Sequence, residues 1–405
     1  MYSLLLSLAA IIIATKLLGE LARRVGQPSV LGGLLAGALL GDSAFGLLDP
    51  RDPAMRALAE LGVLILIFQI GLRTDWRSLK RVDQSVMAVA GAGFVLPFAA
   101  GFGVAHALGA AVLPSLLAGA TLTATSIGIA TRALGDAGAL KSREAEVVLG
   151  AALADTVLGL ILLAAVVALS GGATASASQM VRNASWGAVF VVASLAIGSY
   201  AMPPLFRLLD RIRGRDSVGL FALSFAVLLA AIAAATGSAM ITGAFLAGMI
   251  LHPTPQRQEI EQTATSLGHF FVPIFFAMIG ASVNLPVLGH KAPLLMGAAL
   301  TAVAILAKVA SGFAPWWFRG EKLLVGIGMI PRGEIGLIFM QVGLAAAVLT
   351  PPLFGSLMIA VVATTVLAPP LIKMAVDSEQ AEPEFERPGV WTPEGRRQTK
   401  IGRRH

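Results

Sequence analysis

Stretches of about twenty apolar residues recur along this chain of 405 residues, from Met1 to about Val376. Each stretch, folded as an α-helix, is long enough to cross a hydrocarbon core about 30 Å thick. Hydrophobic residues make up 56% of the chain and charged residues only 13%, whereas water-soluble domains carry about 25% charged residues. The pattern therefore predicts an all-α polytopic membrane protein.

We expect thirteen transmembrane spans, with limits good to a few residues. The expected spans are 2–18, 28–48, 55–72, 84–108, 111–133, 144–170, 184–206, 217–235, 238–252, 265–285, 290–315, 321–347 and 350–375. Lysine and arginine gather in the loops after odd-numbered spans, and the opposite loops hold little beyond Arg51, Arg182 and Lys291. Basic loops are a mark of the cytoplasmic side. We therefore expect a multi-pass protein of the cell (inner) membrane, with its N-terminus outside and its C-terminus in the cytoplasm.

The same distribution explains the net charge of +7. In a membrane protein such an excess reflects basic cytoplasmic loops, so it does not indicate a nucleic-acid partner. The chain has no cysteine, which excludes thiolate metal sites and cysteine nucleophiles. It also shows no histidine cluster, no HExxH motif and no glycine-rich phosphate loop. We expect neither enzymatic activity nor a cofactor.

Two pairs of segments resemble each other across the chain. "LGGLLAGALLG" (31–41) is similar to "ITGAFLAGMIL" (241–251), and "LGVLILIFQIGLRTD" (61–75) is similar to "FFVPIFFAMIGASVNL" (270–285). An odd number of expected spans separates the copies, so the two copies would cross the bilayer in opposite directions. Such inverted-topology repeats are typical of secondary transporters, whose substrate sites lie near the middle of the membrane.

Two spans contain residues that weaken a helix. In "TLTATSIGIATR" (121–132), the hydroxyls of Thr123, Thr125 and Ser126 compete for backbone hydrogen bonds. In "GMIPRGEIGLIF" (328–339), Pro331 removes a backbone donor beside a glycine. These spans hold equivalent places in the two repeats. Interrupted helices at matching repeat positions are the best pointer from sequence to the binding site of a transporter.

Few ionisable residues lie in the membrane interior, away from the ends of the spans: Asp155, Lys308, Arg332 and Glu334. A charge in the middle of a membrane is costly, so each is a candidate functional residue that should have a partner. Asp155 and Lys308 lie at similar depth in spans six and eleven, which predicts an ion pair. Arg332 and Glu334 adjoin the expected helix break. We expect them to neutralise the dipoles of the broken helix.

Seven segments together resemble the monovalent cation/proton antiporter superfamily, and most of all its NapA-like sodium/proton and Kef-type potassium/proton branch. The resemblance covers about residues 20–375, in order. The segments are "RVGQPSVLGGLLAGALLG", "ELGVLILIFQIGL", "TATSIGIATRAL", "VVLGAALADTVLGL", "ITGAFLAGMIL", "FVPIFFAMIGA" and "GMIPRGEIGLI". The resemblance implies a thirteen-helix homodimer in lipid with two crossed discontinuous helices, an elevator-type mechanism and a role in pH homeostasis.

The resemblance also implies a division into domains. A dimerisation domain would comprise residues 1–83 and 217–289, and a core ion-transport domain residues 84–183 and 290–376, with a linker helix at 184–216. The remaining residues, 377–405, are polar and lack apolar periodicity. We expect them to form a disordered cytoplasmic tail.

The family carries its cation- and proton-binding carboxylate at the second of two adjacent positions in the sixth span. Here Asp155 takes the first position and Thr156 the second, and Lys308 matches the lysine that pairs with the first acid. Arg73 also stands where relatives often have an acid. The chain therefore keeps the ion pair and lacks the usual ion-binding acid.

Two accounts follow from this substitution. In one, Asp155 binds Na⁺ or K⁺ with the oxygens of Thr156, Thr125 and Ser126, and Lys308 releases the exchanged proton once the cation weakens its ion pair. Net charge then stays constant, which predicts electroneutral one-for-one exchange. In the other, the Asp155–Lys308 pair is a structural lock. The protein would then carry or leak a different solute, or would be a non-transporting, sensory membrane protein.

Overall fold

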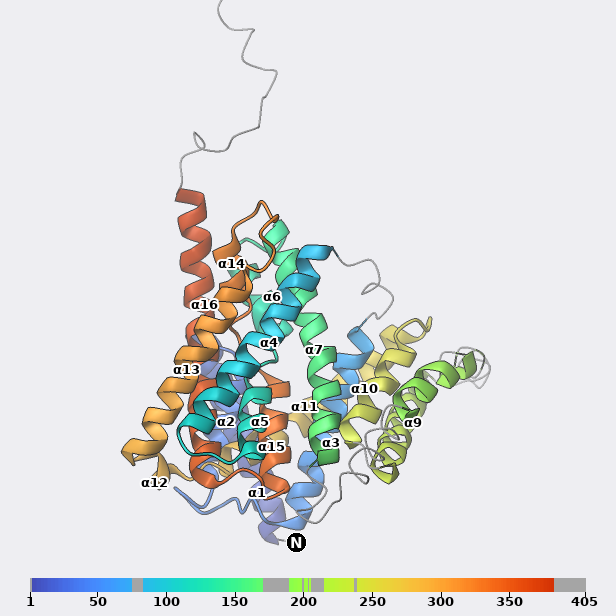
Figure 1. The fold of residues 1–405 in the computed structure, drawn as a ribbon. Coiled ribbons are helices and arrows are strands. Elements are labelled where there is room, and N and C mark those ends of the chain that lie inside the picture. Colours follow the sequence, from blue (N-terminus) through green and yellow to red (C-terminus); the bar gives the residue numbers. More distant parts are fainter. Residues whose placement is uncertain are drawn as a thin grey trace, which may run out of the picture.

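The computed structural model describes residues 2–74, 83–169, 189–198, 200–202, 204, 215–236 and 239–381. This part of the chain is built of helices (Figure 1). They are α1 (Tyr2–Arg24), α2 (Ser29–Leu40), α3 (Pro53–Arg73), α4 (Gln84–Ala107), α5 (Val112–Thr121), α6 (Ile127–Asp136), α7 (Arg143–Leu169), α9 (Arg215–Ala235), α10 (Met240–Leu251), α11 (Arg257–Ala281), α12 (Leu285–Leu288), α13 (Lys291–Ser311), α14 (Lys322–Gly328), α15 (Glu334–Ala345) and α16 (Pro351–Ala381).

Eight helices within the described residues are long and apolar enough to span a bilayer, and several shorter apolar helices accompany them. The all-α membrane architecture expected from the sequence is therefore confirmed. Of the expected span 184–206, residues 189–198, 200–202 and 204 are described, and the rest of the span lies outside the described residues. Helix α16 continues to Ala381, past the limit of 376 expected for the core domain. Residues 382–405, which hold most of the expected tail, lie outside the described residues.

The helices contact one another in two groups. In the first, α3 packs against α10 and α11, and α2 packs against α1 and α11. In the second, α13 packs against α4 and α16, while α4 also contacts α5 and α7. Figure 1 shows α9 and α10 on one side of the molecule and α13 and α16 on the other. The expected division into a dimerisation domain and a core domain stays a prediction.

Glycines at equivalent positions of the two similar segments make equivalent approaches. A Cβ atom on Gly37 of α2 would clash with the carbonyl oxygen of Ala277 in α11. A Cβ atom on Gly248 of α10 would clash in the same way with the carbonyl oxygen of Phe68 in α3. Small residues let helix backbones come this close in a membrane. Two further glycines form a second matching pair. An added Cβ atom on Gly71 would clash with the carbonyl oxygen of Phe245, and one on Gly280 would clash with that of Leu34.

Candidate functional site

Two helix breaks meet in the second group of helices. The first separates α5 from α6 at residues 122–126, and the second separates α14 from α15 at residues 329–333. The backbone N–H of Ser126 donates to the carbonyl oxygen of Pro331 at 2.8 Å, so the two breaks touch. A Cβ atom on Gly333 would lie 2.6 Å from Ser126 Oγ. Only glycine fits at this crossing without moving its neighbour.

A buried ion pair lies next to the crossing. Lys308 Nζ of α13 lies 2.6 Å from Asp155 Oδ2 of α7, and neither side chain is accessible to solvent. The hydroxyl of Thr125, from the first break, donates to the same carboxylate oxygen at 3.0 Å. Removing either partner of such a pair leaves an uncompensated buried charge. The structure thus brings together the two charges that the sequence placed at equal depth.

The hydroxyls around the crossing have different partners. Thr125 Oγ1 also lies 3.1 Å from the carbonyl oxygen of Met329, which joins the two breaks a second time. Thr156 donates to the carbonyl oxygen of Ala152 within its own helix, at 2.9 Å. Ser126 and Thr123 donate to Glu334 and to the carbonyl oxygen of Ala120, respectively. Of the three hydroxyls expected to assist Asp155, Thr125 is the one in contact with it.

The two charges of the second break lie on either side of Gly333. Arg332 is fully buried, and its Nη1 donates to the carbonyl oxygen of Ala124 in the first break at 3.1 Å. The backbone carbonyl of Arg332 accepts a 2.9 Å hydrogen bond from Thr365. Glu334 occupies the first turn of α15, where a negative charge interacts favourably with the helix dipole. Both residues adjoin the second break, and their expected role in neutralising the helix dipoles stays a prediction.

A cavity of about 570 Å³ reaches this crossing; we refer to it as the first cavity. Its floor comprises Thr125, Ser126, Thr156 and Glu334. Asp155 does not line the cavity and lies behind Thr125 and Thr156.

The mouth of the first cavity is defined by Arg73 and Arg132, whose side chains are 59% and 46% exposed. Arg73 Nε pairs with Glu261 Oε1 at 2.7 Å. The first cavity therefore joins the solvent to the hydroxyls beside the ion pair.

One wall of the first cavity comes from the other group of helices, and this wall is not among the features predicted from the sequence. The end of α3 lines the cavity opposite α6, α7 and α15, through Leu66, Gln69, Ile70, Arg73 and the following Thr74. Two polar residues one helical turn apart in an apolar span, Gln69 and Arg73, are the sequence pattern that indicates this wall. Gln69 also donates to the carbonyl oxygen of Ala264 at 2.7 Å.

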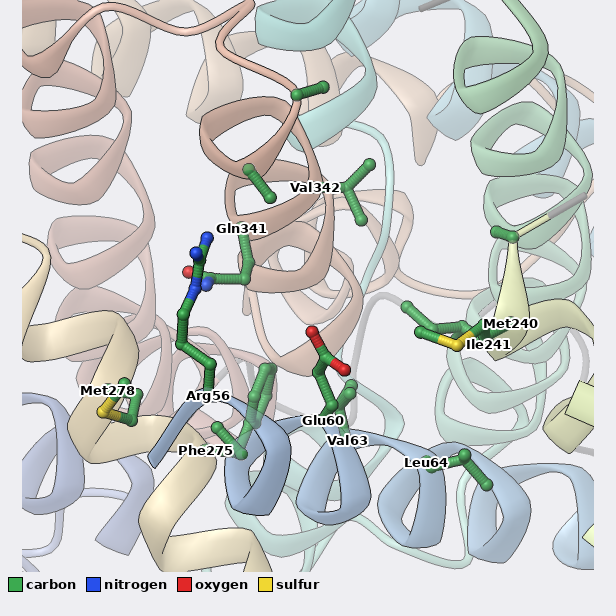
Figure 2. Close-up of a pocket in the computed structure, with 14 residues that line it drawn as sticks. Arg56, Glu60, Val63, Leu64, Met240, Ile241, Phe275, Met278, Gln341 and Val342 are labelled. Carbon is green, nitrogen blue, oxygen red and sulfur yellow. The ribbon is translucent and has the colours of Figure 1, made fainter. Parts of the chain in front are cut away.

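A second cavity, of about 370 Å³, lies along the other halves of α3 and α15. Figure 2 shows Arg56 and Glu60 extending from α3 toward α15, which carries Gln341 and Val342. No residue lines both cavities. On α15, the residues between the part that lines the first cavity and the part that lines the second include Leu337, Ile338 and Phe339, each at most 1% exposed. The two cavities are thus distinct, and the first is the one whose lining includes the hydroxyls at the crossing.

Crossed discontinuous helices beside an intramembrane ion site are an architecture of secondary transporters. The model of the transmembrane sodium/hydrogen exchanger family matches residues 7–377, and the chain belongs to this family.

Among curated proteins, the chain is 36% identical to the high-affinity Na⁺/H⁺ antiporter NhaS3 of Synechocystis, over 96% of this chain and 93% of that protein. It is 32% identical to the Na⁺/H⁺-K⁺ antiporter GerN of Bacillus cereus, over 90% and 94%. Among solved structures, the sodium proton antiporter MjNhaP1 of Methanocaldococcus jannaschii shares the fold. Its TM-score is 0.75 at 17% identity, covering 94% of this chain and all of that one.

Proposed function

We propose that this protein is a secondary active transporter that exchanges a monovalent cation, Na⁺ or K⁺, for protons. The observation that supports this most is the fully buried Asp155–Lys308 pair, 2.6 Å apart, at the crossing of two broken helices. A buried pair of this kind costs free energy to desolvate, and packed apolar residues would often be at least as stable. Because the chain belongs to the sodium/hydrogen exchanger family, a role in transport accounts for a pair that stability alone does not require.

The exchange follows from charge balance at this pair. A cation that enters the first cavity reaches Thr125, whose hydroxyl contacts Asp155. Binding of the cation to the Asp155 carboxylate weakens the attraction that keeps Lys308 protonated, and the lysine releases its proton. The states with a protonated lysine and with a bound cation carry the same net charge. The proposal therefore includes electroneutral one-for-one exchange.

Alternating access would use the interface between α3 and α15. The first cavity reaches the site, and the second cavity is lined by other parts of the same two helices, past the buried residues 337–339 of α15. We propose that α4–α7 and α13–α16 form a core that moves, elevator-like, against α1–α3 and α9–α11. The equivalent glycine approaches of the two segments support an inverted repeat, and the mobile interface would place the second cavity on the exit route.

The orientation rests on the basic loops. The mouth of the first cavity contains Arg73 and Arg132, and helix α7 begins nearby in sequence at Arg143. By the positive-inside rule this end faces the cytoplasm. We propose a homodimer in the inner membrane that opens inward in this structure, with its N-terminus outside and its C-terminus inside. A reporter fused at each end of the chain tests this orientation.

A second candidate function is favoured by one observation, the position of Asp155 behind the cavity wall. In this alternative, Lys308 and Thr125 lock Asp155 in place, and the first cavity serves a different solute. The two candidates differ in a double variant. Replacing both charges with neutral isosteres abolishes transport if Asp155 takes part, and leaves the transport activity of the wild type, whatever its solute, largely intact if the pair is only a lock.

The test of the proposed function uses proteoliposomes that enclose a pH-sensitive dye. Adding Na⁺, K⁺ or Li⁺ outside should alkalinise the lumen, because exchange carries the cation inward and a proton outward, and the rate should not depend on an imposed membrane potential. Thr156→Asp adds a titratable charge to the cavity floor, so its exchange should become sensitive to that potential. Absence of dye response to all three cations in wild-type vesicles would exclude the proposal.

A further inference from the structure

The first cavity contains a carboxylate that the exchange described above does not use. Glu334 lines the floor together with Thr156, although the two residues come from different helices, α15 and α7. Thr156 stands at the position where the family resemblance places the second acid of the ion site. The floor has therefore lost one carboxylate on α7 and still presents another from α15.

Two successive hydroxyls connect this carboxylate to Asp155. Thr125 Oγ1 donates to Asp155 Oδ2 at 3.0 Å, and Ser126 Oγ lies 3.5 Å from Glu334 Oε2. Successive Cα atoms are only about 3.8 Å apart. In the break between α5 and α6, Thr125 therefore contacts Asp155, and the next residue, Ser126, contacts Glu334. The two carboxylates adjoin the same short segment of backbone.

The two carboxylates differ in how firmly they are held. Asp155 has a lysine at 2.6 Å and no solvent exposure. The side-chain contact of Glu334 with Ser126 is longer than the roughly 2.7 Å of an ordinary hydroxyl hydrogen bond. Within the described part of the chain, the ion pairs do not include Glu334. Glu334 is also partly accessible. It is the carboxylate that a cation in the cavity meets first.

We propose that Glu334 supplies the second carboxylate of the cation site, in place of the acid that Thr156 replaces. This inference rests on the proposed function and adds a binding residue to it. Glu334 and the hydroxyl oxygens of Ser126 and Thr156 contact the incoming alkali cation from the floor. Asp155 contributes its charge from behind Thr125. Oxygen ligands of this kind suit hard cations.

The competing role for Glu334 is a charge at the N-terminus of α15, which acts on the helix dipole alone. Glu334→Gln and Glu334→Asp separate the two roles. An aspartate keeps the charge at the helix end but withdraws the carboxylate from the floor by one methylene. A dipole role therefore tolerates aspartate fully, whereas a ligand role does not. Glu146→Gln is a matched control, because Glu146 is exposed in the first turn of α7 and distant in sequence from the floor.

The experiment measures two quantities for each purified variant. The first is the apparent KM for Na⁺ and K⁺ in the dye assay, and the second is the rise in Tm that these ions cause relative to choline. We expect Glu334→Gln to raise the apparent KM at least about tenfold and to lose the rise in Tm. Glu334→Asp should fall between, and Glu146→Gln should match wild type. Adding Thr156→Asp to Glu334→Gln should restore cation dependence.

The outcomes separate this inference from the proposed function. If the wild type exchanges cations for protons and Glu334→Gln has the same apparent KM, the inference is overturned and the proposed function stands. A cation-dependent rise in Tm that Glu334→Gln abolishes, in a protein without exchange, supports the site and excludes antiport. A Glu334→Asp variant identical to wild type in both quantities identifies the dipole role and overturns the inference. Wild type with neither binding nor exchange overturns both.

Discussion

The ion pair behind the floor of the first cavity and the ion pair at its mouth differ in solvent exposure. Behind the floor, Asp155 and Lys308 are paired at 2.6 Å with no solvent exposure. At the mouth, Arg73 and Glu261 are paired at 2.7 Å, with side chains 59% and 31% exposed. The distances are nearly equal, yet solvent screens the second pair and not the first. Burial, and not ion-pair geometry, decides where a change of charge has large effects.

The largest effect should come from removing one charge behind the floor. Asp155→Asn leaves Lys308 buried without a counter-charge, which costs about 3–5 kcal/mol of stability. Thermal unfolding of the purified protein should show a strongly lowered Tm. The double variant Asp155→Asn/Lys308→Gln removes both charges and should recover most of the loss. A double variant less stable than the single one would contradict this view of the pair.

The next effect concerns the crossing of the breaks. Gly333→Ala places a Cβ atom 2.6 Å from Ser126 Oγ, so the two breaks must separate. Overpacking of this kind costs about 1–3 kcal/mol, and we expect exchange to be lost. Combining it with Pro331→Ala should favour a continuous helix and also abolish exchange in a protein that still folds. Gly135→Ala in α6 is the matched control, because nothing lies near its added Cβ atom.

A smaller effect is expected for the hydroxyl that joins the floor to the ion pair. Thr125→Val removes the 3.0 Å hydrogen bond to Asp155 and leaves a buried carboxylate oxygen with one donor fewer. The expected loss of stability is about 1–3 kcal/mol, accompanied by a higher apparent KM for the cation. Thr364→Val in α16 removes a buried hydroxyl that bonds within its own helix and should leave KM unchanged. Equal KM values for both variants would remove Thr125 from the site.

The smallest effect belongs to the mouth. Arg73→Ala breaks an exposed ion pair with Glu261, which contributes at most about 1 kcal/mol. We expect Tm to change by little and the change to vanish in high salt, since screening already weakens this pair. Chemical denaturation at low and high ionic strength checks the prediction. A salt-independent loss of several kcal/mol would show that the mouth is as tightly coupled to the fold as the floor.

The fold could be predicted from the sequence to a large extent because membrane spans impose length and polarity on the chain. The helix breaks near Thr125 and Pro331 were predicted from hydroxyls and from proline, whose effects on a helix are local. Depth along the spans was also enough to predict that Asp155 and Lys308 form an ion pair.

The details of the site could not be predicted in the same way. The sequence predicts Thr156 as a ligand beside Asp155, but nothing in the spacing showed that its hydroxyl donates to the carbonyl oxygen of Ala152 in its own helix. The spacing also did not show that Ser126 lies near Glu334, or that the end of α3 forms a wall of the cavity. These features depend on how helices distant in sequence pack together. Periodicity and local propensity do not contain that information.

The central claim is that Asp155 takes part in exchange and is not merely locked in place. Dye-reported proton flux of the Asp155→Asn/Lys308→Gln double variant tests this most directly, with protein amount and monodispersity matched to wild type. The account predicts a stably folded protein with no proton flux driven by Na⁺, K⁺ or Li⁺, because the amide cannot balance the charge of the cation. Flux at the wild-type rate would contradict the assignment of Asp155 and leave the pair a structural lock.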